Sequence, residues 1–161
     1  MDLTHLDSAG AARMVDVSGK DVTTRTATAR GVFRTTAAVI DLLRRDGLPK
    51  GDALAVARIA GLAAAKRTPD LVPLCHPVAL HGVEVDLALG EADVTITATT
   101  RTADRTGVEM EALTSVVVAG LALYDMVKAV DRSAVLTDVQ LVAKEGGRSG
   151  AWHRTTDRTA T

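Results

Sequence analysis

Asp125 and Lys128 are the first pair of side chains whose types and spacing point to acid-base chemistry. They lie three residues apart in YDMVKA, which predicts neighbouring positions on one face of a helix. On a solvated surface the pair would be an ordinary ion pair worth roughly 0.3 kcal/mol. The segment from Ala112 to Leu123 is apolar nearly all round, so we expect the pair that follows it to be partly buried. A partly desolvated lysine beside a carboxylate has an adjustable pKa and can donate or accept protons.

Two further carboxylates begin the same predicted helix. Thr106 and Glu109 in TGVEMEAL match a capping box, with Thr106 as the N-cap. The capping box does not explain Glu111, which faces roughly the opposite side of the helix. Glu111 and Asp125 are fourteen residues apart, about 21 Å along one helix, so one chain cannot bring both to one reacting atom. This separation predicts two sites, or a symmetric oligomer in which another subunit completes the site.

The stretch LVPLCHPV places Cys75 and His76 between Pro73 and Pro77. Each proline fixes its own φ and keeps the preceding residue out of the helical region, so we expect a stiff, extended segment that aims His76 toward a ligand. Cys75 alone is more often a small buried apolar residue than a nucleophile. The spacing of the four histidines resembles no zinc site, and we predict no fixed metal site.

Basic residues occur in short clusters although the net charge is only −1. A near-neutral chain creates no overall field that favours nucleic acid or a membrane, so an anionic ligand must be held locally. Lys144 and Arg148 flank the glycine-rich EGGRSG, where backbone N–H groups can approach a phosphate, although the spacing is not that of a P-loop. The other candidates are Arg25, Lys50, Lys66 and Arg67.

Composition restricts the class of protein. A chain of 161 residues predicts one domain, and 47% hydrophobic but only 2% aromatic residues predict a core of Ala, Val and Leu that gains further burial by oligomerisation. The single cysteine excludes an internal disulfide and fits a reducing compartment. The N-terminus lacks a signal-peptide pattern, and no apolar run reaches the roughly 18 residues of a membrane span, so we expect a cytoplasmic protein.

The predicted elements alternate between strands and helices over residues 1–150. After an irregular arm at residues 1–20, VTTRTATARGVF predicts a strand that ends near Phe33, and two helices follow in TTAAVIDLLRRDG and ALAVARIAGLAAAKR. Asp52 is the predicted N-cap of the second helix, which we expect to reach about Arg67. A hairpin is predicted in VALHGVEVDLAL and VTITATTRTA around the turn GEAD.

A long helix in TGVEMEALTSVVVAGLALYDMVKAV and a strand in AVLTDVQLVAKEGG complete the domain. With the two earlier helices taken as one layer, the order is β-α-β-β-α-β, a ferredoxin-like α+β sandwich with an antiparallel sheet and helices on one face. We expect residues 151–161 to form a disordered polar tail.

Four stretches resemble one enzyme family in the same order, from about Thr4 to Gly150. They are MVDVSGKDVTTRTATARG, KGDALAVARIAGLAAAKRTPDLVPLCHPV, TGVEMEALTSVVVAGLALYDMVKAV and LVAKEGGRSG. The chain resembles the cyclic pyranopterin monophosphate synthases of molybdenum cofactor biosynthesis, the MoaC family. It departs from the family at Val127, where many relatives have Cys, and at Arg148, where Lys is common. An arginine keeps the charge but changes the hydrogen-bonding geometry.

The resemblance implies a lyase that converts 3′,8-cyclo-7,8-dihydroguanosine 5′-triphosphate into cyclic pyranopterin monophosphate and pyrophosphate. Such a reaction needs repeated proton transfers and a held triphosphate without redox change, which suits acids, bases and cations and no cofactor. Mg²⁺ could accompany the triphosphate without a fixed protein site. The resemblance also implies a homohexamer, a trimer of dimers with sites at the dimer interfaces, and transient contact with the upstream radical SAM GTP cyclase.

The resemblance further implies a role for each matching residue. Lys50 and Lys128 would be the general acid and base, and Asp125 would tune Lys128 or share its proton. His76, Glu109, Met110 and Glu111 would bind and orient the purine-derived ring, and Leu74 and Cys75 beside His76 are further candidate substrate-binding residues, with Cys75 mainly a packing residue. The remaining substrate-binding residues would be Arg25, Lys66, Lys144 and Arg148 around the triphosphate, with Asp16 and Lys20 from the arm.

Two other functions stay open at this point. A non-catalytic purine-nucleotide-binding oligomer would need the cations but not Asp125 beside Lys128. A metal-dependent phosphohydrolase would lose activity with a chelator, and the histidine spacing argues against it.

Overall fold

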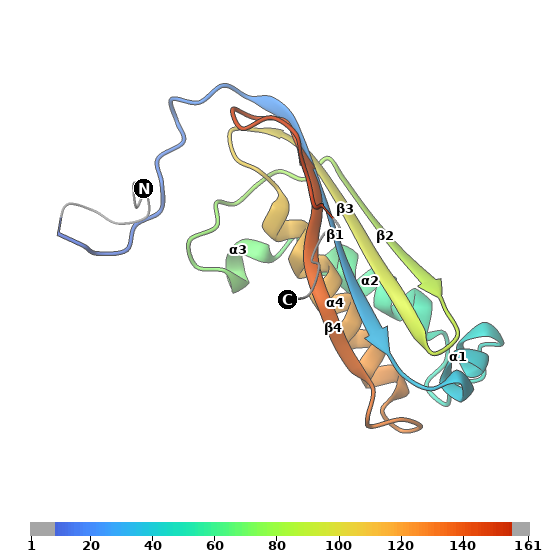
Figure 1. Ribbon diagram of the computed structural model, residues 1–161. Helices are drawn as coiled ribbons and strands as arrows, with labels where there is room; N and C mark the ends of the chain where they lie inside the picture. Colours follow the sequence, from blue (N-terminus) through green and yellow to red (C-terminus); the bar gives the residue numbers. More distant parts are fainter. Residues whose placement is uncertain (1–8, 156–161) are drawn as a thin grey trace, which may run out of the picture.

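Alternation of small apolar residues with threonine and arginine produces the central strand of the sheet. In β1 (Thr23–Arg34), Ala27, Ala29 and Phe33 are buried on one face, while Thr24, Arg30 and Arg34 are exposed on the other. The computed structural model describes residues 9–155, and residues 9–22 form an irregular arm that runs away from the sheet, as predicted (Figure 1).

Four other strands extend the sheet on both sides of β1. β1 pairs antiparallel with β3 (Asp93–Asp104) and with β4 (Val135–Glu145). The edges are β2 (Gly82–Leu89), which pairs with β3 as the predicted hairpin, and β5 (Trp152–His153), so the order is β2-β3-β1-β4-β5. Without β5, this is the strand order of the predicted ferredoxin-like α+β sandwich.

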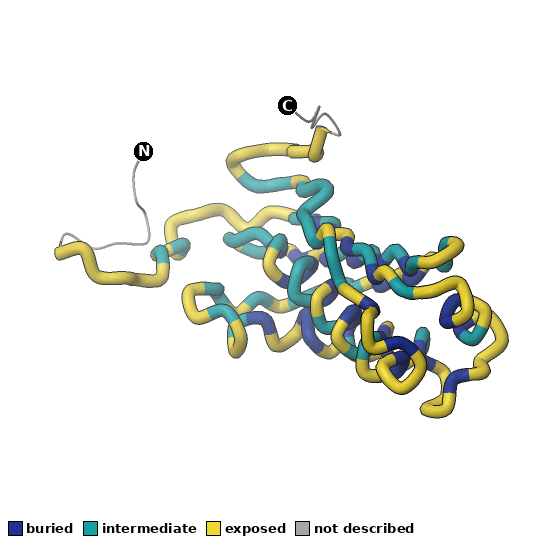
Figure 2. The backbone as a smooth tube through the Cα atoms, turned by 60° about the horizontal axis from the view of Figure 1, so that its bottom comes forward, coloured by how far each residue is buried: buried dark blue, intermediate teal, exposed yellow. Residues whose placement is uncertain are grey.

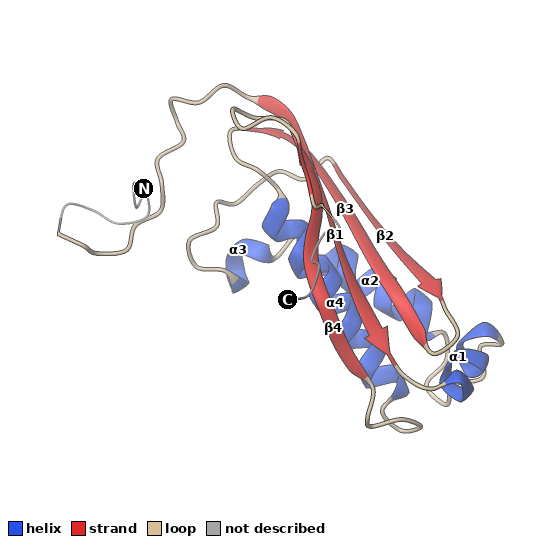
Figure 3. Cartoon of the chain, viewed as in Figure 1, coloured by secondary structure: helices blue, strands red, loops and turns tan. Residues whose placement is uncertain are grey.

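Helices cover only one face of the sheet (Figure 3). α1 (Ala37–Arg44), α2 (Ala53–Ala65) and the short α3 (Thr68–Leu71) lie in the first crossover, and α4 (Glu109–Val127) forms the second. Asp52 caps α2 by accepting a hydrogen bond from the Ala55 N–H, which confirms the predicted N-cap. α2 ends at Ala65, and α3 starts after a break, where the sequence predicted one helix to about Arg67.

α4 is the core helix of the fold, and it is covered by the sheet and by α2 except along one outer stripe. Val116, Ala119 and Leu123 are fully buried, whereas Val117 and Leu121 are exposed. In Figure 2 the buried residues gather where helices and strands pack together, and most of the N-terminal arm is exposed. By length and composition α4 could cross a membrane, but half of it is buried inside the protein, as in the core helix of a soluble domain. The helix is therefore buried or half-buried on most sides, as expected, and is exposed along one stripe that includes Val117 and Leu121.

Part of the predicted tail is ordered. Trp152 and His153 pair with Lys144 and Ala143 as β5, so the expectation of a disordered tail is wrong for these residues. Two contacts of Arg154 stabilise this edge, and the polar composition of the tail gives no sign of them. The Arg154 guanidinium lies 5.5 Å from the Trp152 ring centre, and Arg154 Nε donates to the Leu141 carbonyl. Residues 1–8 and 156–161 of the predicted arm and tail lie outside the described part of the chain.

Close contact between α4 and β1 requires a glycine at position 31. A Cβ on Gly31 would lie 2.8 Å from Val116 Cγ1 and 3.2 Å from Val139 Cγ2. Gly31→Ala should therefore lower the free energy of unfolding in urea by about 1–3 kcal/mol. Gly82→Ala is the matched control, because its nearest neighbour would be 3.9 Å away. Equal stabilities for the two variants would contradict this account of the α4–β1 contact.

Candidate active site

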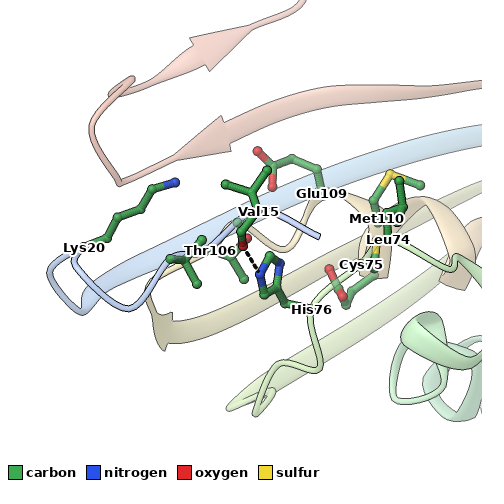
Figure 4. A pocket seen from close by; sticks show the side chains of 11 residues that line it. Val15, Lys20, Leu74, Cys75, His76, Thr106, Glu109 and Met110 are labelled. Carbon is green, nitrogen blue, oxygen red and sulfur yellow. Dashed lines mark hydrogen bonds between the residues drawn. The ribbon is translucent and has the colours of Figure 1, made fainter. Parts of the chain in front are cut away.

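A cavity of about 340 Å³ lies where the arm, the segment after α3 and the start of α4 meet (Figure 4). We call it the carboxylate cavity, because Glu109 and Glu111 lie in its wall. Its other lining residues are Val15, Val17, Lys20, Leu74, Cys75, His76, Thr106, Gly107 and Met110. The structure thus brings together the four residues that were predicted to bind a purine-derived ring and the two further substrate-binding candidates, Leu74 and Cys75.

His76 is held in place at the wall of this cavity. Its Nε2 lies 2.6 Å from the Val15 carbonyl oxygen, and a carbonyl can only accept, so Nε2 carries a proton (Figure 4). The segment that contains Cys75 and His76 is neither helix nor strand, as its flanking prolines predicted. The orientation of the His76 ring is therefore fixed by the arm, and the arm forms part of the cavity wall next to it.

Glu111 is the buried carboxylate of the cavity, with only 3% of its surface exposed. Burial raises the pKa of Glu111, and the neighbouring charge of Glu109 raises it further. Burial also raises the pKa of the Cys75 thiol, with a smaller contribution from Glu111, so this thiol is not activated as a nucleophile. The cavity is therefore an environment that favours the protonated form of the Glu111 carboxyl group more than water does.

The predicted capping box at the start of α4 is wrong. Val108 is the N-cap, no side chain caps the helix, and Glu109 is the first helical residue instead of the third. Gly107 explains the difference, because a Cβ there would overlap the Glu109 carboxylate, which folds back over this residue. Thr106 and Glu109 therefore line the cavity. The capping-box pattern in the sequence led to a wrong role for both residues.

A second, larger hollow of about 660 Å³ adjoins the carboxylate cavity and is rich in cations. We call it the basic groove, and Lys20, Arg25 and Arg148 are its cationic residues. Its other lining residues are Gly19, Asp21, Thr23, Gly147 and Ser149. Lys20 lines both hollows, so the groove and the cavity are neighbours that share this residue.

Hydrogen bonds orient the cations of this region. Arg25 donates from Nε to the Asp104 carbonyl at 2.9 Å and from Nη2 to the Arg105 carbonyl at 3.1 Å. Lys144 donates to Ser149 Oγ, and a small crevice brings Lys144 next to Arg25 and Glu109. The cations predicted around a phosphate, apart from Lys66, therefore lie together.

Two predicted binding residues stand outside both hollows. Lys66 is exposed at the C-terminal end of α2 and lines neither of them. Asp16 accepts a hydrogen bond from the Ser18 N–H, which lowers the pKa of Asp16, and nearby His76 lowers it slightly more. Within residues 9–155, no three or more His, Cys, Asp or Glu side chains are grouped closely enough to hold a metal ion.

Asp125 is clamped between two lysines at the other end of α4. Lys50 Nζ lies 2.7 Å from Asp125 Oδ2 and also donates to the Asp125 carbonyl at 2.9 Å. Lys128 Nζ lies 2.7 Å from Asp125 Oδ1. The structure thus brings together the three predicted catalytic residues, although Lys50 lies 75 positions before Asp125 in the chain. We call this cluster the Lys-Asp-Lys triad.

The triad is charged in its resting state. Hydrogen bonds from Lys128 and Lys50 lower the pKa of Asp125 to about 2, and the bond to Asp125 raises the pKa of Lys128. In the single chain, this pairing favours an ionised Asp125 beside a protonated Lys128. The expected partial burial is wrong for one chain, because the side chains of Lys50, Asp125 and Lys128 are 40%, 56% and 50% exposed.

Asp131 is a residue near the triad that sequence reasoning missed. It is 8% exposed and accepts hydrogen bonds from Thr35 Oγ1 at 2.7 Å and from the Ser133 N–H and Oγ at 2.8 and 2.6 Å. The bonds from Ser133 lower the pKa of Asp131 most, followed by that from Thr35. They fasten the turn after Lys128 to the end of β1. The only signal was Asp-Arg-Ser after the helix, which is typical of an Asx turn.

Removal of the Asp125 charge should change the titration of Lys128 in a defined direction. Because Asp125 raises the pKa of Lys128, Asp125→Asn should lower it toward the ordinary 10.5, as measured by NMR of the lysine side chains against pH. In the wild type this pairing stabilises the fold above pH 3.8 and is lost as the pH falls toward 2. Asp41→Asn, which removes a pair with Arg44, is the control. An unchanged Lys128 titration would contradict the triad.

Comparison with known proteins identifies the relatives of this chain. The protein named cyclic pyranopterin monophosphate synthase from Streptomyces coelicolor is 64% identical over 152 residues, which cover 94% of this chain and 89% of the relative. The protein of the same name from Streptomyces griseus is 65% identical over 95% of this chain and 86% of its own length. Cyclic pyranopterin monophosphate synthase 2 from Mycobacterium tuberculosis is 60% identical over 95% of this chain and 92% of its own length. Residues 14–147 match the MoaC family, and the chain belongs to that family.

Proposed function

We propose that this chain is a cyclic pyranopterin monophosphate synthase, a lyase of molybdenum cofactor biosynthesis. Its substrate is 3′,8-cyclo-7,8-dihydroguanosine 5′-triphosphate, and its products are cyclic pyranopterin monophosphate and pyrophosphate. The observation that carries the proposal is that the carboxylate cavity and the basic groove lie next to each other and share Lys20. A ring with several N–H donors and a polyanionic tail needs these two environments side by side.

The two hollows divide the substrate between them. Glu109, Glu111 and His76 supply hydrogen-bonding groups for the purine-derived ring, with Leu74 and Met110 as apolar walls. The triphosphate faces four cations: Lys20, Arg25, Arg148 and Lys144. When pyrophosphate leaves, these cations stabilise the charge that develops on the leaving oxygens. Asp16 supports the arm through Ser18, and Lys66 binds only if another subunit brings substrate to it.

The Lys-Asp-Lys triad supplies the proton transfers. Lys50 and Lys128 both pair with Asp125, so each starts as an ammonium group that can donate a proton to a ring nitrogen or a leaving oxygen. A lysine that has donated its proton then serves as the base that activates the ribose hydroxyl. That hydroxyl oxygen bonds to the α-phosphorus, the bond from this phosphorus to the bridging oxygen breaks, and pyrophosphate leaves. The redox state of every atom is unchanged.

The distance between the two ends of α4 supports a site shared between subunits. Glu111 and Asp125 are fourteen positions apart on one continuous helix, about 21 Å, and cannot reach one substrate atom. The outer sides of α2 and α4 carry exposed apolar residues, of which Ile59 is 66% and Leu121 is 59% exposed. We expect these faces to be covered in a dimer, and three such dimers to form a hexamer.

The remaining parts of the proposal concern surroundings and partners. We expect a cytoplasmic enzyme that receives its labile substrate from a radical SAM GTP cyclase during transient contact. No resident cofactor is part of this proposal, and Mg²⁺ that arrives with the triphosphate is compatible with it. EDTA should therefore change the affinity for the triphosphate without abolishing turnover.

Turnover by the purified protein is the first test. With the cyclised GTP derivative under anaerobic conditions, the wild type should release pyrophosphate together with a product that oxidation converts into a fluorescent pterin. Lys128→Ala should reduce kcat by about 10²–10⁴-fold, because one proton donor is lost. Arg45→Ala removes an exposed cation outside both hollows and should keep full activity. An active Lys128→Ala enzyme would refute the role of the triad.

The same measurement separates the enzyme from a binding protein. A non-catalytic nucleotide-binding oligomer would bind the substrate tightly, release no pyrophosphate, and bind equally well after Lys128→Ala. The identity with relatives that carry the synthase name does not favour this alternative.

Complementation tests whether two subunits share a site. Glu111→Gln and Lys128→Ala should each be inactive alone, because they disable opposite ends of α4. When the two variants are co-expressed, mixed dimers with shared sites should contain one intact site each and restore roughly a quarter of the wild-type activity. Co-expressed Lys50→Ala and Lys128→Ala are the control, because both residues pair with the same Asp125. Recovery in neither mixture would refute a shared site.

A further inference from the structure

Two consecutive glycines follow the last long strand, and both have left-handed backbone conformations. Gly146 has a φ of +88° and Gly147 a φ of +73°. A Cβ on Gly146 would overlap the Thr24 carbonyl oxygen, so this glycine lets the turn approach the main chain of β1. Gly147 meets a side chain instead, and that side chain belongs to the basic groove.

The atom that Gly147 faces is Nη1 of Arg25. A Cβ on Gly147 would overlap this nitrogen and lie 2.9 Å from Cζ of the same guanidinium. The guanidinium cannot retreat freely, because Nε and Nη2 already donate to the carbonyls of Asp104 and Arg105. Any side chain at position 147 must therefore cover Nη1 or break these two hydrogen bonds.

Nη1 is also the guanidinium nitrogen that remains available to a ligand. Within the described part of the chain it has no hydrogen-bond partner, while Arg25 and Gly147 both line the basic groove. A guanidinium held by two backbone carbonyls has lost its rotational freedom before a ligand arrives, so less entropy is lost when an anion binds. An open, fixed N–H pair in a cationic groove is suited to a phosphate oxygen.

We propose that Gly147 is a positioning residue, whose missing side chain keeps the Nη1 edge of Arg25 open to a phosphate group in the basic groove. This inference rests on the proposed function, since it assumes that the groove receives the triphosphate. It assigns a ligand-directed task to one glycine of EGGRSG and a purely structural one to its neighbour. Gly147 acts through Arg25 and does not itself hold the phosphate.

Gly147→Ala and Gly150→Ala form a matched pair for the test. Gly150 has a similar φ of +64°, but a Cβ there would meet nothing within 4 Å, and it does not line the groove. Binding of inorganic tripolyphosphate to the intact protein is measured by calorimetry. The Gly147→Ala protein loses one charge-assisted contact, so its dissociation constant for tripolyphosphate should rise about tenfold or more. Gly150→Ala should stay within about twofold of the wild type, because it carries only the backbone strain.

A double-mutant cycle separates positioning from general disturbance of the turn. If Gly147 acts through Arg25, then Gly147→Ala should change the affinity less than about twofold in a protein that already carries Arg25→Ala. With the full substrate, Gly147→Ala should raise KM much more than it lowers kcat, because the contact belongs to binding. A turn that merely rearranged would also displace Lys144 and Arg148, and its effect would persist without Arg25.

Each outcome has a distinct meaning. Equal weakening by Gly147→Ala and Gly150→Ala, or an undiminished effect in the Arg25→Ala background, would overturn the inference and leave the proposed function standing. A wild-type protein that binds no tripolyphosphate would refute the phosphate role of the groove and this inference with it. Turnover without such binding would still support the synthase and would place the triphosphate elsewhere.

Discussion

The unbroken course of α4 is the constraint on which the arrangement of the site depends. One helix from Glu109 to Val127 carries Glu111 at its start, while the triad lies at its end. Its dipole favours carboxylates at the N-terminus and a cation at the C-terminus, which is where Glu111 and Lys128 stand. A continuous helix of this length keeps its two ends apart, and its middle packs closely on Gly31 of β1 through Val116. Groups from the two ends of α4 can meet at one reacting atom only if they come from different chains, as in the shared site proposed above.

The two ends of α4 shift the pKa of a carboxyl group in opposite directions. Burial raises the pKa of Glu111, whereas two lysines lower the pKa of the exposed Asp125 to about 2. Burial thus favours the protonated form of Glu111, whereas Asp125 remains an anion that raises the pKa of Lys128. Such a division suits a reaction that needs several proton transfers and no change of redox state.

Periodicity was sufficient to predict most of the fold, but not the features that depend on contacts between distant segments. The strands, the N-cap Asp52 and the length of α4 follow from local patterns. The start of α4 was misjudged because the direction of the Glu109 side chain depends on Gly107 and the cavity. β5 was missed because the contacts of Arg154 that stabilise it join separate segments and leave no local pattern. Spacing indicated that Asp125 and Lys128 pair, but only the family resemblance placed Lys50 beside them, since packing of distant segments creates that contact.

Exposure of the triad connects assembly with proton chemistry. Val117, Leu121 and Asp125 follow one another at four-residue spacing, so the exposed apolar stripe of α4 leads directly to the triad. A subunit that covered this stripe would also remove water from the triad. Desolvation disfavours charged groups, lowering the pKa of a lysine and raising that of an aspartate. These pKa shifts are opposite in direction to those in the single chain. They bring the pKa values of Asp125 and Lys128 closer together, so that proton transfer between them costs less free energy. Assembly would thus convert a solvated ion pair into an acid-base site.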